Sequence, residues 1–292
     1  MTKKKLECPF CKSLNCVLLE KVNSHLNKKD YDLNKCNKCG LQFFTPPVFE
    51  DIYLNEGFLG QIDYYNEIHK GRTEASMWSQ KIFDEIRENR IEIKNKKIID
   101  IGGADGVNFD VLVKDFGINP EDYYILEGDE RSIMACKKRG IKNIIPRYLS
   151  EDLKVKEKFD IVIMSGIIEH FTDLKVCMNA IFKMCNEGAL IFIVTPNRNR
   201  WFLKWKVGLD VPPHHFYRFD KKFFRDNFRD ELIEISTFER KKPYIDSAKS
   251  ISDKLKLHWL LLYPFIPILR MANYFNSEEL YCLLKVRSEV KK

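Results

Sequence analysis

The sequence predicts an α/β protein in which a doubly wound parallel sheet follows a small cysteine-rich domain. Two observations carry this prediction. From residue 96, short apolar runs alternate with stretches of helical periodicity, as in sheets whose strands are buried on both faces by helices. Ahead of them, four of the nine cysteines form two Cys-x2-Cys pairs between residues 8 and 39.

The composition limits the classes of protein that fit. Of the 292 residues, 45% are hydrophobic and 31% charged, which excludes a disordered chain. Lysine and arginine exceed aspartate and glutamate by 49 to 42, a mild excess that permits an anionic partner without demanding one. The start has no secretory apolar segment, and the longest apolar run, 259–269, is shorter than the about 20 residues that span a bilayer. We therefore expect a cytoplasmic protein, whose cysteines are thiols or metal ligands.

The cysteine pairs predict a zinc ribbon over residues 1–47, with short strands at 17–20 and 31–34. Two Cys-x2-Cys turns supply the tetrahedral sulfur site that structural zinc takes. The segment has too few apolar residues to fold unaided, so metal binding would supply the folding energy. Redox-active or incidental cysteine pairs are the alternative. The expected ligands are Cys8, Cys11, Cys36 and Cys39, with Cys16 a bystander and Cys136, Cys177, Cys185 and Cys282 core residues.

The α/β unit is predicted element by element. Residues 48–95 form a linker and a leading helix over 73–89, whose apolar side chains, including Met77 and Trp78, recur at helical spacing and are expected in the core. The remainder, 96–292, is expected to be one catalytic domain. Each expected strand is an apolar run, and each expected helix follows one. The strands are 97–101, 123–127, 142–145, 159–164 and 189–195, and the helices are 107–116, 130–139 and 173–185.

The loop after the first strand indicates a nucleotide-like ligand. Its glycines, from Gly102 to Gly106, let the backbone approach a ligand, and the following helix N-terminus offers free N–H groups. Asp100 lies inside the strand end, and Glu127, at the end of the second strand, can accept both ribose hydroxyls of an adenosine. The loop departs from the G-x-G-x-x-G pattern of dinucleotide-binding folds, which argues against a dehydrogenase.

Four stretches together resemble class I S-adenosylmethionine-dependent methyltransferases, in the subgroup where a four-cysteine ribbon precedes the catalytic domain. They are 98–106 (IIDIGGADG), 126–129 (LEGD), 159–170 (FDIVIMSGIIEH) and 195–197 (TPN). The resemblance implies a Rossmann-like seven-stranded sheet, with a last strand pair near 231–239 and 279–286.

The resemblance also implies a set of cofactor-binding residues. Asp100 and the glycine loop would hold the methionine part of the cofactor, Glu127 would hold its ribose, and the turn after the fourth strand would line the cofactor site. Ala104 stands where many members have glycine. The implied cofactor residues are Asp100, Gly102, Gly103, Ala104, Gly106, Glu127, Met164, Ser165 and Gly166.

Two histidine clusters are the candidates for catalysis. Transfer to oxygen or carbon requires the acceptor to lose a proton, so a general base or a metal helps. The candidates are Glu169, His170, His214 and His215. The alternative is a packing or helix-capping role for His170 and a loop role for the other two histidines. Ubiquinone-biosynthesis O-methyltransferases and small-RNA 3′-end methyltransferases are similar in having Glu-x-x-Glu-His and a later His around a divalent ion. Here Gly166 replaces the first acid, so the sequence argues against a catalytic metal.

The substrate signals lie in a predicted lid and an insertion. The lid, 196–230, interleaves cations with aromatic residues, including Arg198, Arg200, Lys204, Lys206 and Arg218. Such a surface suits an anionic acceptor with a ring or sugar, and a solvated face is the alternative. The insertion, 241–277, has an apolar core at 257–270 that suits a peripheral membrane contact, internal packing or a subunit contact.

We therefore expect an enzyme that uses S-adenosylmethionine and a structural Zn²⁺. Its predicted acceptor is a sugar, a precursor in cell-surface polysaccharide biosynthesis or a related anionic small molecule, methylated on oxygen or carbon. The alternatives are an RNA methyltransferase, for which the ribbon and the basic lid would grip phosphate, and a cofactor-binding interaction protein without turnover.

Overall fold

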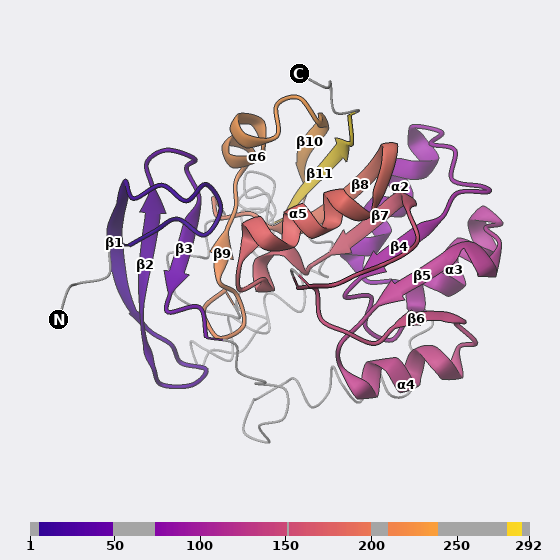
Figure 1. Cartoon of the computed structure of the whole chain (residues 1–292), viewed down its shortest axis with the longest axis horizontal. Coiled ribbons are helices and arrows are strands. Elements are labelled where there is room, and N and C mark those ends of the chain that lie inside the picture. Colours follow the sequence, from indigo (N-terminus) through magenta and orange to yellow (C-terminus); the bar gives the residue numbers. More distant parts are fainter. Residues whose placement is uncertain (1–5, 49–73, 151, 200–209, 239–278, 288–292) are drawn as a thin grey trace, which may run out of the picture.

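The computed structural model describes residues 6–48, 74–150, 152–199, 210–238 and 279–287, and these form two sheets. The larger sheet has seven strands in the order β10-β11-β8-β7-β4-β5-β6, and the smaller has four in the order β1-β2-β3-β9 (Figure 1). Both the doubly wound sheet and the small N-terminal domain predicted from the sequence are confirmed.

The larger sheet is parallel from β6 to β8 and ends in an antiparallel pair, β11 and β10. This confirms the last strand pair that the resemblance implied. Its parallel strands are continuous apolar runs because helices cover both faces. The strands are β4 (Ile98–Ile101), β5 (Tyr123–Leu126), β6 (Asn143–Ile145), β7 (Phe159–Ser165), β8 (Cys185–Pro196), β10 (Leu232–Phe238) and β11 (Glu279–Lys285).

The helices lie over the faces of this sheet, with a separate buried cluster on each side. One cluster includes residues of α2 and α3, and the other includes residues of α5 and α6 together with the ribbon. The α-helices are α2 (Met77–Glu88), α3 (Val107–Phe116), α4 (Glu130–Lys138), α5 (Leu174–Met184) and α6 (Lys221–Asn227), and the 3₁₀ turns are η1 (Pro120–Asp122) and η2 (Ile168–His170).

The smaller sheet is only partly N-terminal. The sequence predicted two of its strands, β1 (Cys16–Asn23) and β2 (Asp30–Cys36), and missed β3 (Gln42–Thr45) and β9 (Tyr217–Arg218). The strand β9 comes from the predicted lid and pairs antiparallel with β3, Phe43 opposite Tyr217. Phe43 is buried in the same cluster as α5 and β8. The ribbon is therefore built into the α/β domain rather than tethered to it.

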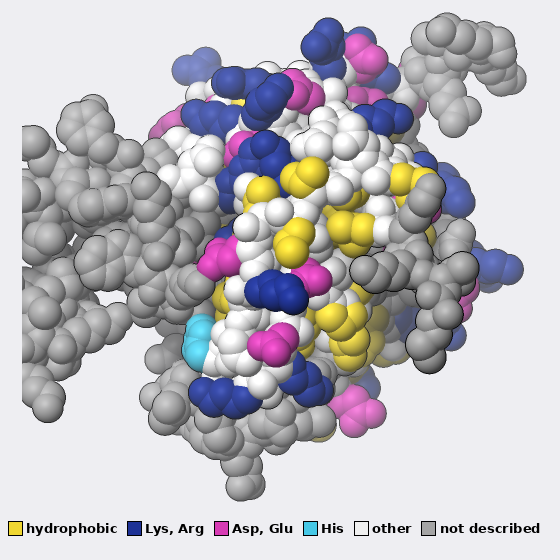
Figure 2. All heavy atoms as spheres, turned by 90° about the vertical axis from the view of Figure 1, so that its left-hand side faces the viewer, with side chains coloured by type: hydrophobic (Ala, Val, Ile, Leu, Met, Phe, Trp, Pro, Cys, Tyr) yellow, Lys and Arg dark blue, Asp and Glu magenta, His cyan; other side chains and the backbone are white. Residues whose placement is uncertain are grey.

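The strand β1 forms the outer edge of the ribbon sheet. Figure 2 shows this side of the molecule, where apolar side chains lie among charged ones. The exposed apolar residues include Val17, Leu18 and Leu19, with 42%, 51% and 46% of their surface accessible.

Two substrate-related predictions lie largely outside the described residues. These are the insertion 241–277 and the central part of the lid, which carries Arg200, Lys204 and Lys206. Within the described part of the chain, no helix combines the length and the apolar character needed to cross a membrane.

Candidate functional site

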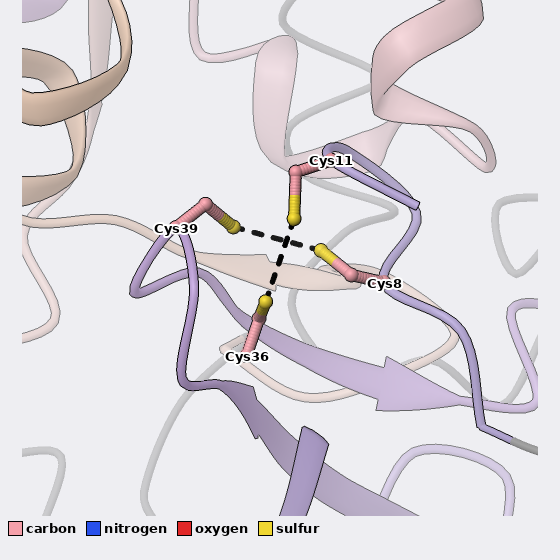
Figure 3. Close-up of side chains that lie close together, drawn as sticks. All are labelled: Cys8, Cys11, Cys36 and Cys39. Carbon is pink, nitrogen blue, oxygen red and sulfur yellow. Dashed lines mark hydrogen bonds between the residues drawn. The ribbon is translucent and has the colours of Figure 1, made fainter. Parts of the chain in front are cut away.

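The four predicted zinc ligands converge in the ribbon. Their side chains point toward one another (Figure 3), and all four sulfur atoms lie within 4.8 Å of one another. The sulfur atoms of Cys8 and Cys39 are 3.6 Å apart, and those of Cys11 and Cys36 are 3.5 Å apart. Ligands on a tetrahedral zinc with Zn–S bonds of about 2.3 Å stand about 3.8 Å from each other. The cluster therefore fits such an ion.

Two turns of the same design present these thiols. The amide of Lys12 donates to the carbonyl of Cys8 at 3.0 Å, and the amide of Gly40 donates to that of Cys36 at 2.9 Å. Cys16 lies outside the cluster, and its thiol donates to the carbonyl of Ser13 at 3.5 Å. The two turns thus account for the Cys-x2-Cys spacing.

A cavity of about 270 Å³ lies at the carboxyl ends of β4 and β7, where doubly wound folds bind their ligands. Among the expected cofactor residues, Asp100, Gly102, Gly103, Ala104, Ser165 and Gly166 line it. Met164, Gly106 and Glu127 do not. Met164 is buried in the core, and Gly106 starts α3 in a left-handed conformation, φ 74°.

The carboxylate of Asp100 is fixed by two buried donors. The hydroxyl of Tyr123 and the side-chain amide of Asn108 each donate to its Oδ2 at 2.8 Å. A Cβ on Gly103 would stand 2.8 Å from the same oxygen, so glycine is required beside it. Burial and the neighbouring carboxylate raise the pKa of Tyr123 well above its ordinary value, which keeps the hydroxyl a donor. The result is an oriented anion in the cavity wall, suited to a ligand ammonium group.

Glu127 is tied to the glycine loop next to the cavity. Its Oε2 accepts from the amide of Ala104 at 3.0 Å, and its Oε1 from the amide of Asp129 at 2.9 Å. Burial raises its pKa from 4.5 to about 7, although the amide donors oppose the rise. Ala104 itself has φ 52°, so the left-handed turn is kept although alanine stands there.

The raised pKa predicts a pH-dependent affinity for an adenosine ligand. The pKa of Glu127 is higher in the cofactor-free folded chain than in the unfolded chain. The contribution of this group to folding stability is therefore present at low pH and is lost as the pH rises from 4.5 to about 7. Ribose hydroxyls donate to the ionised form. We expect the affinity for S-adenosylhomocysteine to fall about tenfold per pH unit below about pH 7 and to level off above it.

Titration calorimetry from about pH 6 to about pH 8 measures this profile. Glu127→Gln should bind more weakly and lose the pH dependence, whereas Glu187→Gln, at an exposed position, should behave as the parent chain. A flat profile in the parent chain would contradict the role of Glu127.

The start of α2 supplies a wall of the cavity. Met77 and Trp78, which we expected in the core, line the cavity. Two further lining residues, Ser76 and Ser79, belong to the helix cap, since Ser76 accepts from the amide of Ser79. The available signal was this serine pair at the start of the helical pattern, which is typical of a helix N-terminus.

The two histidine clusters come together beside the cavity. Glu169 and His170 belong to η2, which follows β7 and Gly166, and the other two histidines lie in the turn before β9. The His170 ring centroid is 4.6 Å from that of His214 and 4.7 Å from that of His215, and the latter two rings stack at 4.3 Å. The amide of Phe216 donates to the carbonyl of Glu169 at 2.8 Å, which joins the two segments.

Each side of this cluster has an orienting partner. The Nδ1 of His215 lies 2.8 Å from a carboxylate oxygen of Asp210, a residue that the sequence analysis missed. The Oε2 of Glu169 accepts from the hydroxyl of Thr195 at 2.9 Å. Burial lowers the pKa of His170 to about 4, so this imidazole is neutral near pH 7.

Two cations that we expected to meet an anionic acceptor contact the ribbon instead. Arg198 donates to the carbonyl of Gly40 at 2.7 Å and pairs with Asp220. The Arg218 guanidinium lies 5.0 Å above the ring of Phe44. Both side chains are used to join β9 and its neighbours to the ribbon, so neither supports the prediction of an anionic acceptor.

Comparisons with known proteins agree on the fold. A family model described as "Methyltransferase domain" matches residues 73–231. A curated relative, the "Ubiquinone biosynthesis O-methyltransferase" of Pelagibacter ubique (strain HTCC1062), is 26% identical over a 166-residue alignment, and the match covers 52% of this chain and 63% of the relative. The chain thus aligns with less than two thirds of that protein's length.

Among the solved structures that resemble the chain, two with TM-scores above one half illustrate the likeness. A chain from the complex between the Haloferax volcanii Trm112 methyltransferase activator and a methyltransferase has a TM-score of 0.54 and 12% identity, covering 79% of this chain and 98% of that one. The [4+2]-cyclase SpnF has a TM-score of 0.52 and 11% identity, covering 79% of this chain and 95% of that one. At such low identities the likeness extends to the fold alone.

Proposed function

The chain belongs to the class I S-adenosylmethionine-dependent methyltransferase family, and we propose that it transfers the methyl group of this cofactor to a hydroxyl oxygen of a small-molecule acceptor. The match covers the cavity, the glycine loop and both histidine segments, because all of them lie within residues 73–231. The acceptor atom is argued from the residues beside the cavity.

The residues around the cavity fit the cofactor. Asp100 supplies a fixed anion for the ammonium of the methionine part, and Glu127 lies next to the loop, where it can accept ribose hydroxyls. The positive φ values of Gly102 and Ala104, 66° and 52°, turn the loop backbone tightly at the cavity wall. The bound cofactor supplies an electrophilic methyl group on sulfur.

The carrying observation is the convergence of Glu169 and three histidines behind Gly166, which lines the cavity. Methyl transfer itself requires mainly alignment. A neutral amine needs no base to act as the nucleophile, whereas a hydroxyl must lose its proton. A cluster able to accept that proton, or to stabilise the negative charge left on the oxygen, therefore supports an oxygen acceptor, with an acidic carbon as the alternative. The sequence-based expectation of a sugar or glycan precursor stays part of this proposal.

Methyl transfer to paired acceptors tests the assignment. Labelled S-adenosylmethionine is offered with sugar and other small-molecule hydroxyls, with matching amines and with an acidic carbon. We expect labelled hydroxyl product, and a fall of about 100-fold or more for Glu169→Gln with cofactor affinity unchanged. His25→Ala, an exposed histidine of the ribbon, is the matched control. Transfer to amines that Glu169→Gln leaves intact would overturn the oxygen assignment.

A further inference from the structure

We propose that Glu169, His170, His214 and His215 form a second metal site, which binds a divalent first-row transition metal beside the cofactor cavity. One imidazole nitrogen from each of the three histidines lies within 4.8 Å of the others. Zinc–nitrogen bonds of about 2.1 Å require ligands about 3.4 Å apart in a tetrahedral site. The rings of His214 and His215 stack at 30° and that of His170 stands edge-on to both, so binding an ion requires the three rings to rotate until their nitrogens converge.

The backbone holds the two halves of this site in place. The amides of His214 and His215 both donate to the carbonyl of Val211 at 3.1 Å, which forms a tight turn. This turn is fastened to η2 by the bond between Phe216 and Glu169 and to the ribbon through β9. Ligands from two distant segments are therefore presented on a preformed frame.

Asp210 orients His215 in the manner of metal-bound histidines. Its carboxylate engages Nδ1 at 2.8 Å, which leaves Nε2 turned toward Glu169, 3.9 Å from its Oε1. That separation exceeds a hydrogen bond and is close to the distance between two ligands of one ion. A carboxylate that binds the far nitrogen of a ligating histidine fixes its ring and raises its basicity.

The donor set selects the class of metal. Three imidazole nitrogens and one carboxylate oxygen suit Zn²⁺, Mn²⁺, Fe²⁺ or Co²⁺, whereas Mg²⁺ and Ca²⁺ prefer oxygen alone. An acid at position 166 could not complete the site, since a Cβ there would stand 1.8 Å from the Trp78 ring. The set thus differs from the pattern with two acids that the sequence lacks, because two adjacent histidines replace the missing acid.

Such an ion would lower the pKa of an acceptor hydroxyl at the cavity rim. In this respect the inference rests on the proposed function, while binding of the metal can be measured without any acceptor. An ion here has a sulfur-free environment, unlike the ribbon site, so the two sites are distinguishable by spectroscopy.

Cobalt substitution of the intact, tag-free protein tests the site. Chelator-treated protein is titrated with Co²⁺ and monitored by absorption and metal analysis. We expect a second equivalent that adds the d–d bands of four-coordinate Co²⁺ without further thiolate charge-transfer bands. His214→Gln and His170→Gln should lose this equivalent and keep the thiolate bands, and Asp210→Asn should weaken it about 10–100-fold. His25→Ala should bind as the parent chain.

The outcomes separate the two proposals. A single equivalent with thiolate bands at saturating Co²⁺, or a second equivalent that survives His214→Gln, overturns the metal site. If protein that binds Co²⁺ only in the ribbon still methylates oxygen, the proposed function holds and the second metal site does not. A second equivalent in protein that transfers no methyl group would support the metal site and contradict the proposed function.

Discussion

Replacing Cys36 with serine is expected to release the ribbon metal and to lower methyl transfer at least tenfold, while cofactor affinity stays within about threefold. Cys36 ends β2, and β2 pairs with β3, which pairs with β9. Without the sulfur cluster this sheet loses its anchor, and the turn that carries His214 and His215 loses its support. The cofactor cavity lies on β4, β7 and α2, so it should remain.

Cys16→Ser is the matched control, because this thiol lies in the same ribbon and outside the cluster. Metal content, methyl transfer and calorimetric binding of S-adenosylhomocysteine are compared in the three proteins. A Cys36→Ser protein that loses its metal and keeps full transfer would show that the ribbon does not support the histidine turn. If cofactor binding is lost as well, the two sheets are more tightly coupled than we infer.

Gly166→Ala is expected to weaken cofactor binding at least tenfold, which is about 1.4 kcal/mol. Gly166 has φ 68°, and an added Cβ would stand 1.8 Å from a ring carbon of Trp78. Because both residues line the cavity, the indole has to move and the wall changes shape. The left-handed backbone adds a strain of about 1–2 kcal/mol.

Gly140→Ala separates strain from steric clash. Gly140 has φ 80° with nothing within 4 Å of its added Cβ, so alanine there meets the strain alone. Thermal unfolding should show a lower melting temperature for both variants. Cofactor titration should show a lower affinity for Gly166→Ala only. Adding Trp78→Ala to Gly166→Ala should recover part of the affinity. Equal cofactor affinity in Gly166→Ala and the parent chain would contradict the packing described for Trp78.

The sequence predicted the elements whose signals are local. The strand ending at Asp100, the glycine loop and the cysteine turns are each read within a few residues, and the structure has them where expected. The strand β9 was missed because two residues carry no periodicity, and its partner β3 lies far away in the chain.

The candidate site was predicted in part for the same reason. The histidines could be named from their neighbours, but Asp210 gains its role only through its contact with His215. Trp78 looked like a core residue, since a helical stripe does not reveal that its first turn faces a cavity. Arg198 and Arg218 show the opposite error. Their charge was interpreted as a sign of an anionic substrate, whereas their side chains contact the ribbon.

The pairing of β3 with β9 also determines which parts of this protein can be exchanged. Phe10 packs its ring against Phe223 at 5.2 Å, and Asn227 of α6 donates to the carbonyl of Cys39 at 2.9 Å. The unit that accompanies the ribbon is therefore discontinuous in sequence and comprises 6–48 together with 210–228. A chimaera that grafts the N-terminal segment onto a related enzyme would leave Phe10 and Phe43 without their partners. Transplanting both segments keeps these contacts.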